Sequence, residues 1–200
     1  MTVPDRNDLK PRTGDALLIV DVQNDFLPGG SLAVSRGDEV VPVLNRYLKI
    51  FMAQRLPVYA TRDWHPQLHC SFRERGGPWP PHCVADTSGA KFAAALQLPP
   101  AAVVISKAAT VEQDAYSGFQ GTDLDNRLRA ANISRLYIGG LATDYCVLNT
   151  VRDALRLGYQ VHLLEDAIRA VDVQPGDGQR AEDEMTRLGA KHITLERIAG

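Results

Sequence analysis

Cys146 is the residue of this sequence best placed to act as a nucleophile. It follows two glycines and the apolar run 136–138, and apolar residues recur at helical spacing from Val147 onward. This pattern predicts a thiol in the first turn of a helix, with Thr143 or Asp144 as the cap. Unpaired backbone N–H groups and the positive end of the helix dipole favour the thiolate, the form that attacks carbonyl carbon. A buried structural cysteine produces the same local pattern, so this motif alone does not decide for catalysis.

Other reactive side chains also stand at the ends of short apolar runs. They are Asp21 after 16–20, Asp63 and His65 after 57–60, and Lys107 after 103–105. If these runs are parallel strands, their carboxyl ends meet at one edge of the sheet, where such sheets bind ligands. Taken alone, Asp21 is explained as a turn cap and Lys107 as solvated surface. An acid, an amine and a thiol converging on one edge instead indicate a catalytic site.

Asp63 and His65 are two residues apart, a spacing that in extended chain directs both side chains to the same side. A carboxylate and an imidazole suit a metal ion, and His69 and His82 offer further imidazoles. His82 follows two prolines in a stiffened loop, which favours it as a ligand, whereas His69 is equally explained by local hydrogen bonds. Three protein ligands with open positions are typical of a catalytic rather than a structural metal site.

The elements that must position these residues alternate between strand-like and helical patterns. The apolar runs are 16–20, 57–60, 103–105, 136–138 and 161–164, with a sixth candidate at 193–195. The helical patterns are 40–55, 123–131, 147–157 and 179–188. This alternation predicts an α/β fold: a single-domain, Rossmann-like three-layer sandwich with a central, mostly parallel sheet and helices on both faces. The long irregular stretch 63–90 has the length typical of a functional loop.

The 200-residue chain is long enough for one core, since 44% of its residues are hydrophobic. We expect a polar N-terminal extension at 1–13, one folded domain at 14–200, and a solvated connection without chemistry at 165–178. A net charge of -2 with interspersed charges offers no patch for nucleic acid or membrane, so the expected partner is a small molecule. Three cysteines and no secretory signal indicate the reducing cytoplasm. One sequence does not exclude a homo-oligomer.

Six segments form a combined pattern that is more specific than any one of them. They are 19–26 (IVDVQNDF), 61–65 (TRDWH), 77–84 (GPWPPHCV), 105–107 (ISK), 115–119 (AYSGF) and 140–147 (GLATDYCV). The combination resembles the nicotinamidases (pyrazinamidases) of the isochorismatase-like cysteine hydrolases, over nearly everything from Ala16 to the C-terminus. The Asp, Lys and Cys elements are typical of the superfamily. The Asp-x-His with a later Trp-Pro-x-His is typical of its metal-containing nicotinamidase branch.

This resemblance implies hydrolysis of nicotinamide, and of pyrazinamide-like aromatic amides, to the acid and ammonia, with a role in NAD salvage. It implies Cys146 as the nucleophile that forms a thioester, Asp21 as general acid and base, and Lys107 as the cation between the two anions. Amide hydrolysis requires attack on a poor electrophile and protonation of the departing ammonia, which agrees with these roles. The resting position of the proton shared by Asp21 and Cys146 stays open.

The resemblance also implies a cis peptide between Leu141 and Ala142, which directs the backbone N–H groups of Ala142 and Cys146 toward the developing oxyanion. Aromatic positions that enclose the substrate ring in the family correspond to Phe26, Trp79 and Tyr116. Aromatic residues beside apolar runs are also frequent in cores, so these three are candidates for a pocket.

For the metal, the resemblance implies Asp63, His65 and His82 as ligands of one divalent ion, with the pyridine nitrogen of the substrate able to fill an open position. Zinc is the expected metal, and iron or manganese also accept two imidazoles and a carboxylate. Some relatives use a further histidine in this loop. His69 is not at their spacing, so we exclude it from the ligand set.

Alternative functions remain open at this point. The nearest is a related cysteine amidohydrolase acting on another small amide, carbamoyl or ureido compound, although the metal residues argue against it. An isochorismatase proper acts on an ether and needs neither the metal nor the cysteine. In a metal hydrolase, metal-bound water would attack and Cys146 would only pack. A non-catalytic ligand binder or oxidant sensor is a further alternative, against which the set Asp21, Lys107 and Cys146 argues.

Overall fold

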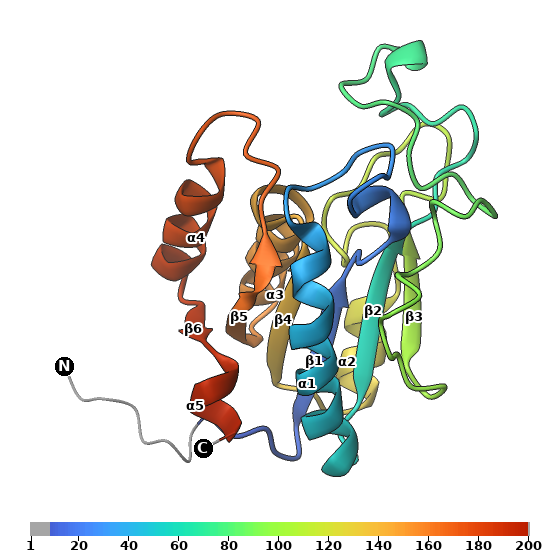
Figure 1. Cartoon of the computed structure of the whole chain (residues 1–200). Helices are drawn as coiled ribbons and strands as arrows, with labels where there is room; N and C mark the ends of the chain where they lie inside the picture. The colour runs from blue at the N-terminus through green and yellow to red at the C-terminus, as the bar shows by residue number, and fades with distance from the viewer. Residues whose placement is uncertain (1–8, 200) are drawn as a thin grey trace.

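The computed structural model describes residues 9–199 and is built around one six-stranded sheet (Figure 1). The strands are β1 (Asp15–Val20), β2 (Val58–Asp63), β3 (Val103–Lys107), β4 (Arg135–Leu141), β5 (Gln160–Arg169) and β6 (Lys191–Ile193). Their order in the sheet is β3-β2-β1-β4-β5-β6, and each registered pair is parallel. The predicted α/β fold with a mostly parallel sheet is confirmed.

Helices cover both faces of this sheet. They are α1 (Val40–Ala53), α2 (Leu124–Ala130), α3 (Leu148–Arg156), α4 (Asp177–Leu188) and α5 (Leu195–Ala199). Side chains alternate along a strand, so Leu17 and Ile19 of β1 face one layer while Leu18 and Val20 face the other. The first pair packs with buried residues of α1 and α5, and the second pair packs with those of α2, α3 and α4. The three-layer sandwich is therefore confirmed.

Helix α1 illustrates how the sequence pattern creates a layer. Leu44, Tyr47, Leu48 and Phe51 stand at positions i, i+3, i+4 and i+7 of the helix and are all buried. This spacing places them on one stripe of the helix, which faces the sheet, while the charged residues between them stay on the solvent side. The amphipathic pattern at 40–55 thus correctly predicted a surface helix.

The strand order reverses between β1 and β4, which are direct neighbours in the sheet. Open parallel sheets have a crevice beyond the carboxyl ends of the strands at such a reversal. Asp21 directly follows β1, and the turn that carries Cys146 begins one residue beyond β4, after Ala142. The fold therefore places the predicted acid and the predicted nucleophile on the two sides of this crevice.

Several strands extend further than the apolar runs indicate. Asp63 and Lys107 are the last residues of β2 and β3, and β5 continues to Arg169. The expectation of a solvated connection is therefore wrong for 165–169. Polar residues are accepted in this strand because the carboxylate of Asp166 receives hydrogen bonds from the Tyr47 hydroxyl at 2.8 Å and from the backbone N–H of Leu195 at 2.8 Å.

At the N-terminus, residues 1–8 of the predicted extension lie outside the described residues. Leu9 is buried in the core, and its carbonyl accepts a hydrogen bond from the Tyr137 hydroxyl at 2.9 Å. The division between an extension at 1–13 and a domain at 14–200 stays a prediction.

The long segment between β2 and β3 contains one short 3-10 helix, Arg73–Arg75, and is otherwise irregular. Isolated bridges pair His65 with Val84 and Phe72 with Trp79. These bridges fold the segment back on itself and return His82 to the neighbourhood of His65. Within the described part of the chain, no helix combines the length and apolar character needed to cross a membrane.

Candidate active site

Lys107 is the centre of the site. Its ammonium group, at the end of β3, donates a hydrogen bond to Oδ1 of Asp63 and another to the carbonyl of Ala115 at 2.9 Å. It also lies 3.0 Å from Oδ2 of Asp21 and 3.5 Å from Sγ of Cys146. Burial disfavours the charged ammonium, but the carboxylates of Asp21 and Asp63 outweigh burial and raise the pKa of Lys107 well above its ordinary value. A buried cation thus joins two acids and a thiol.

Asp21 has no solvent exposure, and each of its carboxylate oxygens has a different neighbour. The hydroxyl of Thr61 donates to Oδ1 at 2.6 Å, while Oδ2 faces Lys107. Burial raises the pKa of Asp21 above its ordinary value, Lys107 opposes this, and the nearby charge of Asp63 adds to it. A carboxyl with a raised pKa accepts and returns a proton more readily near neutral pH, which suits a general acid and base.

Cys146 lies in a π-helical turn, Thr143–Val147, that leads directly into α3. Burial raises the pKa of its thiol well above the ordinary value, Lys107 opposes this, and Asp21 raises it further. The expectation that the helix start favours a resting thiolate is therefore outweighed by burial. A protonated thiol beside Asp21 instead places a proton donor next to a base.

The expected cap at this turn is absent. Ala142 stands at the N-cap, and no side-chain cap is made there among the described residues. The carboxylate of Asp144 instead accepts the backbone N–H groups of Val171 and Asp172, each at 2.9 Å. The peptide between Leu141 and Ala142 is cis, as the resemblance implied. Ala142 itself lines the same pocket as the sulfur of Cys146. The backbone of this turn therefore borders the space in which a carbonyl would meet the thiol.

Asp63, His65 and His82 form a cluster whose ligand atoms all lie within 4.8 Å of one another. Nδ1–H of His65 donates to the carbonyl of Ala108 at 3.2 Å, and Nδ1–H of His82 donates to that of Pro80 at 2.8 Å. Carbonyls only accept, so they fix the ring protons at Nδ1 and leave both Nε2 lone pairs for a metal. Nε2 of His65 is buried without a hydrogen-bond partner in the described residues.

Charge also fits a metal at this cluster. Burial opposes ionisation of Asp63, but Lys107 and His65 outweigh burial and hold the pKa of this carboxyl well below its usual range. Burial lowers the pKa of His82, so its ring is neutral near pH 7. An ionised carboxylate and neutral imidazoles are the forms that bind metal. The three residues therefore fit one divalent metal ion.

His69 lies next to this cluster, and both of its ring nitrogens are occupied. Nε2–H donates to the carbonyl of Gln113 at 3.0 Å, and Nδ1 accepts from the Ser71 hydroxyl at 2.7 Å. The ring stacks on His65 with centroids 4.2 Å apart. This geometry agrees with leaving His69 out of the ligand set, because no nitrogen lone pair is free for a metal.

Two residues of the segment 19–26 hold parts of the Asp63-His65-His82 cluster in place. The side-chain amide of Gln23 accepts the backbone N–H of Asp63 at 2.8 Å and donates to its carbonyl at 2.8 Å. Oδ2 of Asp25 accepts the N–H of Cys83, next to His82, at 2.7 Å. Both belong to the sequence segment 19–26, yet their partners are distant in sequence, so the pattern alone did not indicate these contacts.

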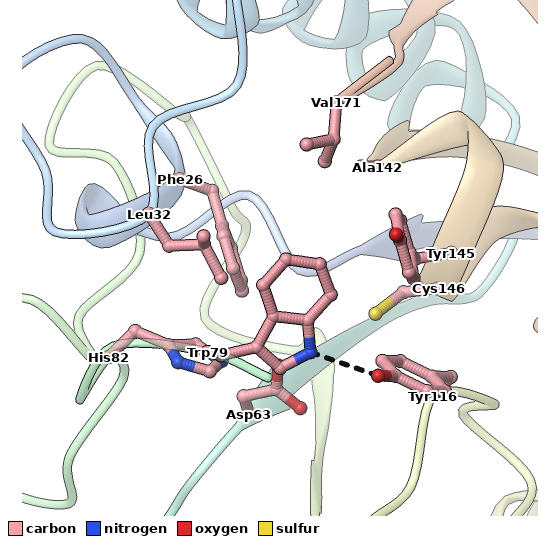
Figure 2. A pocket seen from close by; sticks show the side chains of 10 residues that line it. All are labelled: Phe26, Leu32, Asp63, Trp79, His82, Tyr116, Ala142, Tyr145, Cys146 and Val171. Atoms are coloured by element: carbon pink, nitrogen blue, oxygen red, sulfur yellow. Dashed lines mark hydrogen bonds between the residues drawn. The ribbon is translucent and has the colours of Figure 1, made fainter. Parts of the chain in front are cut away.

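A pocket opens directly above the thiol (Figure 2). It is lined by Phe26, Leu32, Asp63, Trp79, His82, Tyr116, Ala142, Tyr145, Cys146 and Val171. Figure 2 shows the sulfur of Cys146 pointing into this space between Trp79 and Tyr116. Nε1–H of Trp79 donates to the Tyr116 hydroxyl at 2.9 Å. The three predicted aromatic residues, the predicted nucleophile and two of the three predicted metal ligands thus border one cavity.

Three lining residues were not predicted from the sequence. Tyr145 is an aromatic residue next to Cys146 in the segment 140–147, and this position was a signal that could have identified it. Its ring packs edge-on against Trp79, with the centroids 5.1 Å apart. Leu32 and Val171 come from loops with no motif, and only the three-dimensional structure brings them to the pocket.

Comparisons with known proteins identify the family of this chain. The isochorismatase domain model matches residues 15–197. The nicotinamidase of Escherichia coli (strain K12) is 41% identical, over 90% of this chain and 94% of its own length. Pyrazinamidase of Pyrococcus horikoshii, solved in complex with zinc, has a TM-score of 0.88 and 49% identity, over 91% of this chain and 99% of its own.

A protein from L. infantum, solved in complex with nicotinate, has a TM-score of 0.86 and 36% identity. It covers 93% of this chain and 95% of its own length. The family indicated by the six sequence segments is thus confirmed by a domain match and by similarity in both sequence and structure. This chain belongs to the isochorismatase domain family.

Proposed function

We propose that this protein is a nicotinamidase, which hydrolyses nicotinamide, and pyrazinamide-like aromatic amides, to the acid and ammonia and serves NAD salvage. One observation carries this proposal. The thiol of Cys146 and the carboxyl of Asp21 both lie beside the buried ammonium of Lys107, and the thiol faces an aromatic pocket that the Asp63-His65-His82 cluster borders. The relatives named above, which include a nicotinamidase and a protein that binds nicotinate, support the same substrate class.

In the first half of the reaction, Asp21 takes the thiol proton of Cys146 as the sulfur attacks the amide carbon. Because burial raises the pKa of the thiol, the sulfur needs a neighbouring base to accept its proton for the attack. Lys107, 3.5 Å from the sulfur, stabilises the negative charge that develops. The carbonyl oxygen becomes an oxyanion, which we assign to the backbone N–H groups of Ala142 and Cys146.

Collapse of this intermediate breaks the carbon–nitrogen bond. Asp21 returns its proton to the leaving nitrogen, which departs as ammonia, and the acyl group stays on Cys146 as a thioester. Asp21 is then ionised and accepts a proton from the water that attacks the thioester. The same proton passes to the departing sulfur, so nicotinic acid is released and the thiol is restored.

Asp63, His65 and His82 would hold a divalent metal ion, for which we propose zinc, with Fe²⁺ or Mn²⁺ as alternatives. When bound, the metal supplies a Lewis acid that coordinates the pyridine nitrogen and orients the ring. Phe26, Trp79 and Tyr116 would enclose the flat ring and exclude water from it.

Location in the reducing cytoplasm and assembly into a homo-oligomer stay predictions. The first rests on three free cysteines.

The test is ammonia release from nicotinamide by the purified protein, beside Cys146→Ala and a sample from which metal has been removed with a chelator. We expect turnover in the parent protein, a loss of roughly 10,000-fold or more in Cys146→Ala, and recovery of the chelated sample when zinc is added back. Turnover that persists in Cys146→Ala would contradict the thiol mechanism. Absence of ammonia from nicotinamide, with release from a carbamoyl or ureido compound, would contradict the proposed substrate.

A further inference from the structure

Val171 lines one side of the pocket and belongs to the segment 170–172, which follows β5 and precedes α4. We propose that this wall segment, held in place by Asp144, limits the size of the ring substituents that the enzyme accepts. The proposal rests on the proposed function, because it concerns how the same pocket selects among aromatic amides.

Asp144 ties the wall segment to the nucleophile. It lies two residues before Cys146, in the π-helical turn, and both of its carboxylate oxygens are used. Oδ1 accepts the backbone N–H of Val171 and Oδ2 that of Asp172, each at 2.9 Å. Hydrogen bonds to an ionised carboxylate are among the stronger ones in proteins. Asp144 therefore links the position of the wall segment directly to the turn that carries the thiol.

A second carboxylate ties the same segment to α4. Asp172 has a φ of 53°, a left-handed conformation that turns the chain, and its Oδ1 accepts the N–H of Gly178 at 2.8 Å. A Cβ at Gly178 would lie 2.6 Å from Cβ of Ala170, so only glycine permits this close approach. The wall segment is thus held from both sides.

The side chain of Val171 is half-buried and faces the end of the pocket opposite Asp63 and His82 (Figure 2). In nicotinamide, one ring carbon lies between the pyridine nitrogen and the carbon that bears the amide. The position opposite this carbon is the one farthest from both anchored groups. With the nitrogen directed to the Asp63-His65-His82 cluster and the amide to Cys146, this position faces the end of the pocket bounded by Val171. A methyl group there, in 5-methylnicotinamide, would meet the wall.

The experiment measures kcat/KM for 5-methylnicotinamide divided by kcat/KM for nicotinamide. Val171→Ala removes two methyl groups from the wall and should raise this ratio about tenfold, since accommodating one extra carbon of a substrate in an apolar pocket changes discrimination by roughly 10- to 200-fold. Val171→Leu, which removes no atoms, should lower the ratio. Val173→Ala is the matched control, because Val173 lies two residues along the same loop, is 54% exposed and does not line the pocket. Its ratio should equal that of the parent enzyme.

Asp144→Asn tests the anchor itself. The amide keeps one acceptor oxygen and loses the other, so one wall hydrogen bond is lost and the ratio should rise toward that of Val171→Ala, whatever happens to kcat. Ratios equal to the parent's in Val171→Ala, Val171→Leu and Asp144→Asn, with nicotinamide still hydrolysed, would overturn this inference and leave the proposed function standing. A parent enzyme that releases no ammonia from nicotinamide would overturn both.

Discussion

The cluster around Lys107 and the wall of the pocket are built in different ways. Asp21, Asp63 and Lys107 end or directly follow parallel strands, are at most 4% exposed, and contact one another through charged groups. The pocket-lining residues Leu32 and Val171 come from separate loops and are only half-buried. The sheet therefore fixes the reacting groups, and the loops shape the space around the substrate. We expect substitutions in the cluster to abolish chemistry and substitutions in the wall to change selectivity.

Lys107→Met should have the largest effect, because it leaves Asp21 and Asp63 buried without their cation. Removing one partner of a buried ion pair costs about 3–5 kcal/mol of unfolding free energy. Loss of the positive charge beside the thiol should lower kcat/KM by roughly 100- to 1000-fold. Both quantities are measured on the same preparation, by denaturant unfolding and by ammonia release.

Lys91→Met is the matched control, since the Lys91 side chain is exposed. Activity within about tenfold of the parent in Lys107→Met would break the comparison, because the removal of a single oxyanion-stabilising donor already costs more than that.

His82→Ala should have the next largest effect, on metal affinity. It removes one of the three proposed metal ligands. The loss of metal affinity should therefore exceed the roughly 100-fold that is lost when a hydrogen-bonding partner of a ligand is removed. His69→Ala, which removes only the ring that stacks on His65, should stay within about that 100-fold. Competition with a chromophoric chelator measures both affinities. Equal losses in the two variants would place His69 in the ligand set.

Trp79→Phe should have a moderate effect, because Trp79 belongs to the loop-built part of the site. It keeps an aromatic face but loses the hydrogen bond to the Tyr116 hydroxyl. We expect KM for nicotinamide to rise roughly tenfold while kcat changes little, the pattern of lost binding rather than lost chemistry. Tyr116→Phe is the control, because it removes the same hydrogen bond and keeps the indole ring of Trp79. A fall in kcat with unchanged KM would assign Trp79 to the reacting groups instead.

Thr61→Val should have the smallest effect and should appear mainly at acid pH. The Thr61 hydroxyl stabilises ionised Asp21, so its removal raises the pKa of a carboxyl that burial already raises. A general base works only when ionised, so activity falls as the pH decreases through this pKa. The acid limb of the kcat/KM profile should therefore move to higher pH in Thr61→Val and stay in place in Thr61→Ser. A limb that moves to lower pH would contradict the role of Asp21.

The parts of the site that were predictable from the sequence are those attached to strand ends. Asp21, Asp63, Lys107 and Cys146 each stand beside a short apolar run, and parallel strands necessarily bring such positions to one edge. The contact between Lys107 and Asp63, which links the reacting groups to the candidate metal ligands, was not predictable from the sequence. It depends on the pairing of β2 with β3, and the register of that pairing places these two residues opposite each other.

The parts that were missed depend on polar groups whose partners are far away in the sequence. Glu165 and Asp166 interrupt the apolar pattern of β5, so the sequence did not predict that the strand continues. The strand accepts Asp166 because its carboxylate receives hydrogen bonds from Tyr47 and Leu195. Asp144 reads as a helix cap until the loop after β5 is placed beside it. Local patterns therefore predict elements and their ends, whereas the contacts between loops follow only from the assembled fold.

The measurement that tests the central claim most directly is detection of the acyl group on Cys146 itself. Enzyme turning over nicotinamide is quenched in acid, digested and analysed by mass spectrometry. We predict that the peptide carrying Cys146 gains the mass of one nicotinoyl group, that hydroxylamine removes it, and that peptides carrying Cys70 and Cys83 stay unmodified. Full turnover by an enzyme whose Cys146 is never acylated, together with retained activity in Cys146→Ala, would contradict the account.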